Sequence, residues 1–201
     1  SHDVAAVITA KTVSLSAVKT YDGTTSLTGY VTVTTGVGSE TLTYSGATAN
    51  NAHVSSTGKY INAITLVNAT DGSGGLASNY QLPTLDNTHA PVTINAATLT
   101  PTISNVGVTK VYDGTTDAPT GFAATYTYSG LVANDTGATL TNTGAVYNDK
   151  NVLVANKLTV SGLSISGITG TNSSLASDYV LDATSHDVAA VITAKTVSLS
   201  A

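Results

Sequence analysis

The chain has 201 residues, of which 41% are apolar and only 9% charged, and its formal net charge is −5. Its seven cations, all lysines, face 12 acidic residues, so the chain offers no basic surface for nucleic acid. No apolar run reaches the roughly 18 residues of a membrane-spanning helix, so no membrane span is expected either. The absence of cysteine excludes disulfides, thiolate zinc sites and cysteine nucleophiles.

The remaining composition favours β-structure. Threonine occurs 37 times, whereas arginine, methionine and tryptophan are absent and glutamate and glutamine occur once each. Threonine, valine, isoleucine and tyrosine suit a pleated, half-buried surface, while the best surface-helix formers are nearly missing. The composition therefore predicts an all-β fold with at most one short helical turn per domain.

Alternation of apolar and polar residues locates the expected strands along the chain. The segments with this period-two pattern are residues 4–8, 13–15, 30–34, 60–67, 124–128 and 157–161. Asp-Gly, Ser-Gly, Asn-Asp and Thr-Gly pairs separate them and are typical of turns. The two segments Leu76–Tyr80 and Leu175–Tyr179 are the places where a helical turn is expected.

Internal repeats organise the chain at two levels. The segment Ser1–Ala17 recurs without a mismatch at Ser185–Ala201, 184 positions later. Within this long period, Tyr21–Thr25 returns as Tyr112–Thr116, 91 positions later. The chain is therefore expected to contain two diverged domains that alternate along a longer array.

We place four parts along the chain. Residues 1–10 are expected to be the last strand of a preceding repeat, 11–95 domain A, 96–193 domain B, and 194–201 the first strand of a following repeat. The chain contains no methionine, so we expect a fragment of a longer protein, with any export signal upstream. The linkers near 95–97 and 193–195 are short, which predicts elongated domains arranged end to end, each with neighbouring repeats as its partners.

The repeated Tyr-Asp-Gly triplet predicts a structural turn in each domain. The aspartate can accept a hydrogen bond from an N–H two residues on, and the glycine can adopt positive φ. The tyrosine ring is expected to anchor the turn to the core. A sugar-binding Tyr-Asp pair is the alternative, but Asp-Gly is first of all turn chemistry. The residues of this turn signature are Tyr21, Asp22, Gly23, Tyr112, Asp113 and Gly114.

Longer stretches resemble a known family. Besides Lys-x-Tyr-Asp-Gly-Thr-Thr, the chain carries Asn-Asp-Lys-Asn-Val at 148–152, Leu-Thr-Val-Ser-Gly-Leu at 158–163 and Ser-Asp-Tyr-Val-Leu at 177–181. These resemble YDG/MBG-type repeats of large secreted bacterial adhesins similar to filamentous haemagglutinin. The resemblance implies a compact, elongated β unit, β-grasp-like, repeated between an exporting region and a cell-attached end. A sandwich-like arrangement is the alternative. The resemblance brings no catalytic residues.

The inventory of reactive side chains does not favour an enzyme. Asp135-Thr136-Gly137 matches the tripeptide of aspartic proteases, but the aligned segment 37–39 has no carboxylate to form a pair. Glu40 is the only glutamate, and the four histidines have no metal-ligand spacing. A glutamate-assisted isopeptide bond could form only from Lys19 or Lys59, so packing and hydrogen bonds are expected to hold the domains.

No cofactor is expected, and calcium is the one metal considered. Asp71–Gly75, Asn134-Asp135 and Asn148-Asp149 offer oxygen ligands, but no D-x-D-x-D run accompanies them, and solvated turns are favoured. The expected catalytic, cofactor-binding and metal-binding residues are therefore none.

These observations predict a structural spacer, or stalk, of a secreted or cell-surface bacterial adhesin, projecting a binding region from the cell. Near-perfect copying over a long period suits a part that sets length. Two alternatives remain open. Tyr44, Tyr126 and Tyr128 could stack on sugar rings as a low-affinity carbohydrate or matrix-binding module. The low charge and threonine-rich edges could instead support homotypic association in a biofilm.

Overall fold

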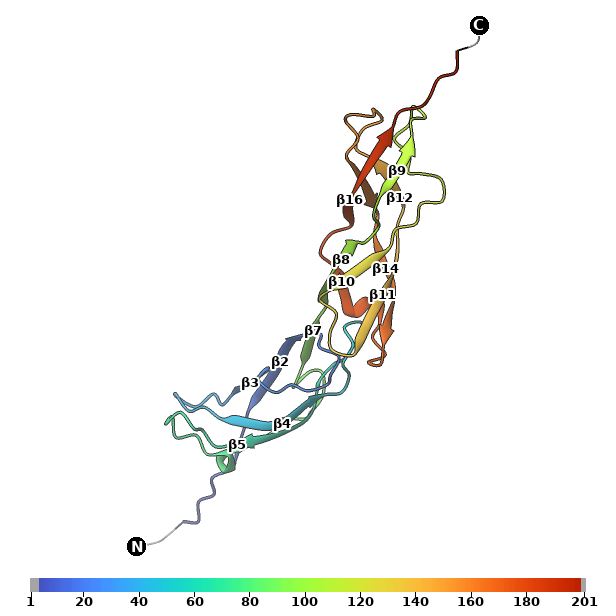
Figure 1. The fold of residues 1–201 in the computed structure, drawn as a ribbon. Coiled ribbons are helices and arrows are strands. Elements are labelled where there is room, and N and C mark those ends of the chain that lie inside the picture. The colour runs from blue at the N-terminus through green and yellow to red at the C-terminus, as the bar shows by residue number, and fades with distance from the viewer. Residues whose placement is uncertain (1–3, 200–201) are drawn as a thin grey trace. The chain divides into compact units, whose positions relative to one another are not determined.

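The structure is a computed structural model that describes residues 4–199. It divides into two compact units, residues 1–96 and 97–201, and we keep the names domain A and domain B for them. Each domain is built of strands, with one short 3-10 turn at Ala77–Asn79 in A and at Ala176–Asp178 in B (Figure 1). The all-β prediction is confirmed, and both helical turns lie where they were expected.

Domain A contains strands of two to seven residues. In chain order they are β1 (Lys11–Thr12), β2 (Ser14–Thr20), β3 (Val31–Thr34), β4 (Thr43–Ala49), β5 (Ile61–Val67), β6 (Tyr80–Gln81) and β7 (Val92–Asn95).

The first long strand organises the sheets of domain A. The first half of β2 pairs antiparallel with β3, and its second half pairs parallel with β7. Just before it, β1 pairs parallel with β6, and β4 and β5 form an antiparallel hairpin. The bridges Ser26↔Thr48 and Tyr60↔Pro91 connect this hairpin to the rest of the domain.

Alternation along β2 directs one of its faces into the core of domain A. Leu15 and Ala17 are buried, and Lys19 occupies the next inward position and is also buried. Leu27 and Ile61, from other segments of the domain, are also fully buried. A lysine at a core position needs hydrogen-bond partners, because an unpaired buried ammonium is very costly.

Domain B repeats this plan with more divided strands. In chain order they are β8 (Ala97–Ile103), β9 (Val108–Val111), β10 (Tyr126–Ser129), β11 (Asp135–Thr141), β12 (Gly144–Tyr147), β13 (Lys157–Ser161), β14 (Ser164–Gly170), β15 (Tyr179–Leu181) and β16 (Ser185–Thr193).

The sheets of domain B show why its strands correspond to those of domain A. One sheet has the order β10-β8-β15, another the order β12-β13-β16-β9, and β11 pairs with β14. Strand β8 pairs antiparallel with β10 and parallel with β15, and β9 pairs parallel with β16. Together β8 and β9 therefore make the same types of pairing that β1 and β2 make in domain A.

The core of domain B lies under the four-stranded sheet. Leu158 and Val160 of β13 are fully buried. Leu158 packs with Tyr147, Ala190 and Ile192, and Val160 packs with Ile103 and Leu163. The fold of each domain is sandwich-like. The helical elements of the described residues are the two three-residue 3-10 turns, and the sandwich-like alternative fits these sheets.

The end segments differ from what their sequence suggests. Residues 185–193 form β16, which lies between β13 and β9, whereas the described part of the identical segment 1–9 forms no strand. Residues 194–199 also form no strand. Residues 1–3 and 200–201 lie outside the described residues. The assignment of 1–10 and 194–201 to strands of neighbouring repeats stays a prediction, because a strand forms only against a partner strand.

Candidate functional site

In domain A the Tyr-Asp-Gly turn follows directly after β2. The Oδ1 atom of Asp22 accepts hydrogen bonds from the backbone N–H and the hydroxyl of Thr24, each at 2.9 Å. Gly23 has a φ of 79°, which a residue with a Cβ adopts only with strain. The aspartate and the glycine thus act together to reverse the chain.

The side chain of Lys19 holds this turn in place through hydrogen bonds. Its side chain is fully buried, and its Nζ atom donates to Asp22 Oδ1 at 2.6 Å, to the Thr24 carbonyl at 3.0 Å and to the Ser26 carbonyl at 2.9 Å. An ammonium has three N–H donors, so these contacts use all of them. The sequence analysis considered Lys19 only for an isopeptide bond and not as part of the turn, although a lysine stands three positions before the aspartate in both copies.

Domain B contains the same arrangement of hydrogen bonds at its own Tyr-Asp-Gly turn. Lys110 Nζ donates to Asp113 Oδ1 at 2.9 Å and to the Thr115 carbonyl at 3.0 Å. Asp113 Oδ1 accepts the Thr115 N–H at 2.9 Å, and Gly114 has a φ of 84°. We call this arrangement of lysine, aspartate, glycine and threonine the lysine-locked turn.

The tyrosines of the two turns lie in different surroundings. Tyr21 is buried and stacks on His53 with ring centroids 6.3 Å apart, whereas Tyr112 is 37% exposed. The expectation that the tyrosine anchors the turn to the core is therefore wrong for domain B. There Tyr147 lies in the core, and Lys110 Nζ is 5.5 Å from its ring centroid.

The hydrogen bonds of the lysine-locked turn lower the pKa of both aspartates. The hydrogen bond from Lys110, together with the Thr115 N–H, lowers the pKa of Asp113 to about 2. Burial raises the pKa of Asp22, but hydrogen bonds from Lys19 and Thr24 outweigh it, so its pKa lies below the ordinary value. Both aspartates are therefore ionised at neutral pH, as the lysine-locked turn requires.

Acidification is expected to release the lock in domain B. Because the folded pKa of Asp113 is about 2 and the unfolded value is about 3.9, its stabilising contribution is complete above pH ~4. That contribution is then lost as the pH falls through the folded value. Urea midpoints measured between pH 5 and 2 should therefore fall less steeply for Asp113→Asn than for the parent chain. Equal slopes would contradict this assignment.

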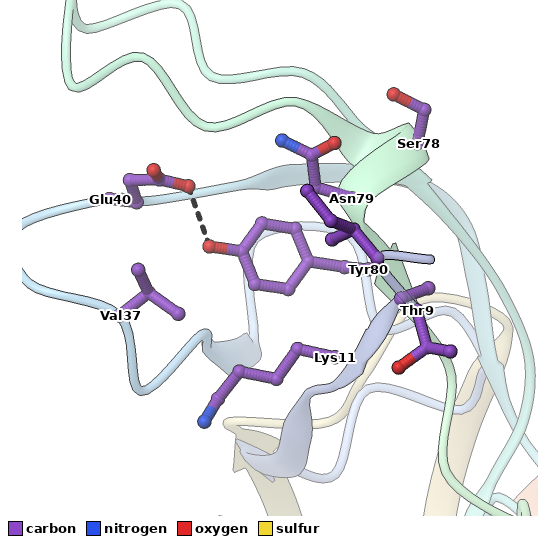
Figure 2. A pocket seen from close by; sticks show the side chains of 9 residues that line it. Thr9, Lys11, Val37, Glu40, Ser78, Asn79 and Tyr80 are labelled. Carbon is purple, nitrogen blue, oxygen red and sulfur yellow. Dashed lines mark hydrogen bonds between the residues drawn. The ribbon is translucent and has the colours of Figure 1, made fainter. Parts of the chain in front are cut away.

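Domain A also contains a cavity of about 450 Å³ (Figure 2). Tyr80 donates its hydroxyl to Glu40 Oε2 at 2.6 Å, and this bond raises the pKa of Tyr80. Figure 2 shows that hydroxyl pointing toward Glu40, with the Lys11 side chain on the other side of the ring. The cavity is lined by Ile8, Thr9, Ala10, Lys11, Val37, Glu40, Ser78, Asn79 and Tyr80. One carboxylate among these residues does not make the acid pair of a glycosidase.

A matching tyrosine–carboxylate contact occurs in domain B. Tyr179 donates to Asp135 Oδ2 at 2.5 Å, and Ser174 donates to the same oxygen at 2.7 Å. The Asp of the Asp-Thr-Gly tripeptide thus joins the start of β15 to the start of β11. Sequence alignment did not match Glu40 of domain A with Asp135 of domain B. The segment that aligns with the Asp-Thr-Gly tripeptide is 37–39, and Glu40 follows it and makes the contact with its longer side chain.

Two of the aspartates considered for calcium, Asp71 and Asp149, already have protein partners. Asp71 accepts the Thr41 hydroxyl at 2.7 Å and the Ser73 N–H at 3.0 Å, and these bonds lower its pKa to about 2. Asp149 accepts the Asn151 N–H at 2.7 Å. Within residues 4–199 no group of three or more histidine or acidic side chains could hold a metal ion.

Comparison with known proteins gives one family. A YDG domain is found at residues 95–186, which covers most of domain B and includes its lysine-locked turn. No curated protein and no solved structure matches the chain. In the part of the chain that the structure describes, no helix is long and apolar enough to cross a bilayer.

Proposed function

We propose that this chain is a structural spacer of a secreted or cell-surface bacterial adhesin, which holds a binding region away from the cell. The YDG domain in B and the exact repetition of a 17-residue segment support this proposal.

The observation that carries the proposal is the lysine-locked turn, which two diverged sequences both build. In each copy the charged groups of the signature bond to one another and to their own backbone. Groups used in this way stabilise a fold and are not available to bind or transform a ligand. A part repeated for its shape needs this property, because each copy must fold in the same way without a ligand.

The three tyrosines considered for carbohydrate binding direct their hydroxyls into their own domains. Tyr44 donates to the Leu27 carbonyl at 3.1 Å, and Tyr128 donates to the Ala138 carbonyl at 2.6 Å. The hydroxyl of Tyr126 is buried. These hydroxyls are therefore used within the domain, while the three rings themselves are half-buried.

Small-angle scattering tests the spacer proposal on the chain as it is. We expect an extended particle whose maximum dimension does not change between low and high salt. A compact or freely hinged profile would overturn the proposal. Sedimentation at rising concentration separates the homotypic alternative, which requires growing assemblies, from the spacer, which requires an unchanged monomer.

A further inference from the structure

A threonine and the only glutamine of the chain lie directly opposite each other in domain A. Thr12 of β1 and Gln81 of β6 are paired residues of a parallel ladder, and Gln81 Nε2 lies 2.9 Å from Thr12 Oγ1. The Cδ atom of Gln81 is one C–N bond of ~1.33 Å from this nitrogen. A hydroxyl nucleophile is therefore held beside a carboxamide by the pairing of the two strands.

A histidine–aspartate pair lies close to these residues in the fold. His89 Nδ1 is 2.8 Å from Asp86 Oδ1. An ionised carboxylate only accepts hydrogen bonds, so this contact fixes the ring with Nδ1 toward Asp86 and Nε2 on the opposite side of the ring. The His89 backbone N–H and then its ring lower the pKa of Asp86, which keeps the carboxylate ionised. A base oriented by a carboxylate is the usual means of activating a hydroxyl.

Backbone hydrogen bonds hold the segment that carries His89 against the strand edge that carries Thr12. The Val13 N–H bonds to the Gln81 carbonyl and the Ala17 N–H bonds to the Pro91 carbonyl, each at 3.0 Å. The segment that carries His89 thus leaves and rejoins the strand edge that carries Thr12. Thr12 and His89 both line a cavity of about 510 Å³.

We propose that Thr12 and Gln81 form an intramolecular ester, which joins β1 to β6 covalently. Thr12 Oγ1 attacks Gln81 Cδ, while His89 Nε2 accepts the hydroxyl proton and passes it to the departing nitrogen. The Cδ–Nε2 bond breaks, an Oγ1–Cδ bond forms, and one ammonia leaves. No oxidant, metal or cofactor takes part, and the proposal does not depend on the spacer function.

Domain B provides an internal comparison. Its corresponding parallel pair is Thr98 and Val180, which retains the hydroxyl but has no carboxamide. The ester is therefore specific to domain A, and Thr98 serves as a matched control position.

Intact-mass measurement of the purified chain tests the proposal. We expect a mass about 17 Da below that calculated from the sequence, since one ammonia is lost, and a fragment spectrum that joins the peptides containing Thr12 and Gln81. The variants Thr12→Val and Gln81→Leu should have their full calculated masses, while Thr98→Val should keep the deficit. His89→Ala should slow ester formation by about 100-fold or more after refolding.

Two results would overturn the proposal. One is a parent chain at its full calculated mass. The other is a deficit that persists in Gln81→Leu, which would assign the lost ammonia to an asparagine succinimide elsewhere. An unchanged rate of ester formation in His89→Ala would contradict the proposed role of His89 as the base. Amide exchange in domain A of Thr12→Val should show that the unlinked chain is still folded, so that a full mass reports chemistry and not misfolding.

Discussion

Replacing Lys19 with methionine is expected to destabilise domain A by about 2–4 kcal/mol. Methionine fills a similar volume but donates no hydrogen bond, so the carbonyls of Thr24 and Ser26 would lose their buried partner. Asp22 would lose its cation, although its side chain is 42% exposed and water can partly replace the contact. Native-state amide exchange of domain A measures this loss directly.

Two comparisons make the Lys19 result specific. Lys110→Met in domain B should cost less, because the Lys110 side chain is 7% exposed whereas that of Lys19 is fully buried. Lys150→Met, at an exposed position, should change the stability of domain B by less than about 0.5 kcal/mol. A Lys19→Met chain as stable as the parent would show that the lysine-locked turn does not hold the domain.

Replacing Gly130 with alanine is expected to destabilise domain B by about 2–4 kcal/mol. Gly130 has a φ of 86°, and a Cβ atom there would lie 2.1 Å from the carbonyl oxygen of Thr98. Thr98 belongs to β8, the central strand of its sheet, so it cannot move away without breaking ladder hydrogen bonds. Denaturant titration followed by amide exchange in β8 and β10 measures the effect.

Gly121 is the matched control for this substitution. Its φ is 79°, but a Cβ atom added there would have no other atom within 4 Å. Gly121→Ala should therefore carry only the cost of the left-handed backbone, about 1–2 kcal/mol. Equal losses at the two glycines would show that backbone strain, and not the Thr98 carbonyl, determines the effect.

The strands could be predicted from sequence because their alternation is regular. The segments predicted at 30–34 and 60–67 overlap β3 and β5, and the one predicted at 157–161 coincides with β13. Period-two patterns report which face of a strand is buried, and threonine-rich outer faces keep that contrast clear. The 3-10 turns were predictable for a similar local reason, since both follow the same Leu-Ala-Ser pattern.

The lysine contacts that hold the turns could not be predicted from the alternation of apolar and polar residues. Alternation along β2 marks position 19 as inward, but a lysine is normally read as exposed. The lysine becomes acceptable there only because three oxygens from the following turn converge on it. The contact between Tyr80 and Glu40 was hidden similarly, because it joins residues 40 positions apart.

The two copies of the 17-residue segment show most clearly what the sequence alone does not determine. The same nine residues are a central strand at 185–193 and form no strand over the described residues 4–9. Sequence determines which residues are suited to a strand, whereas hydrogen bonding to a neighbour decides whether the strand exists.

The parallel pairing of β2 with β7 and of β9 with β16 has a mechanical consequence for each domain. In domain A, Ala17–Thr20 of β2 pairs with Val92–Asn95 of β7, and in domain B β9 pairs with β16 in the same sense. The chain therefore enters and leaves such a pair at opposite ends. Tension along the chain would load these ladder bonds in shear, so that they must rupture together and cannot be peeled apart one at a time.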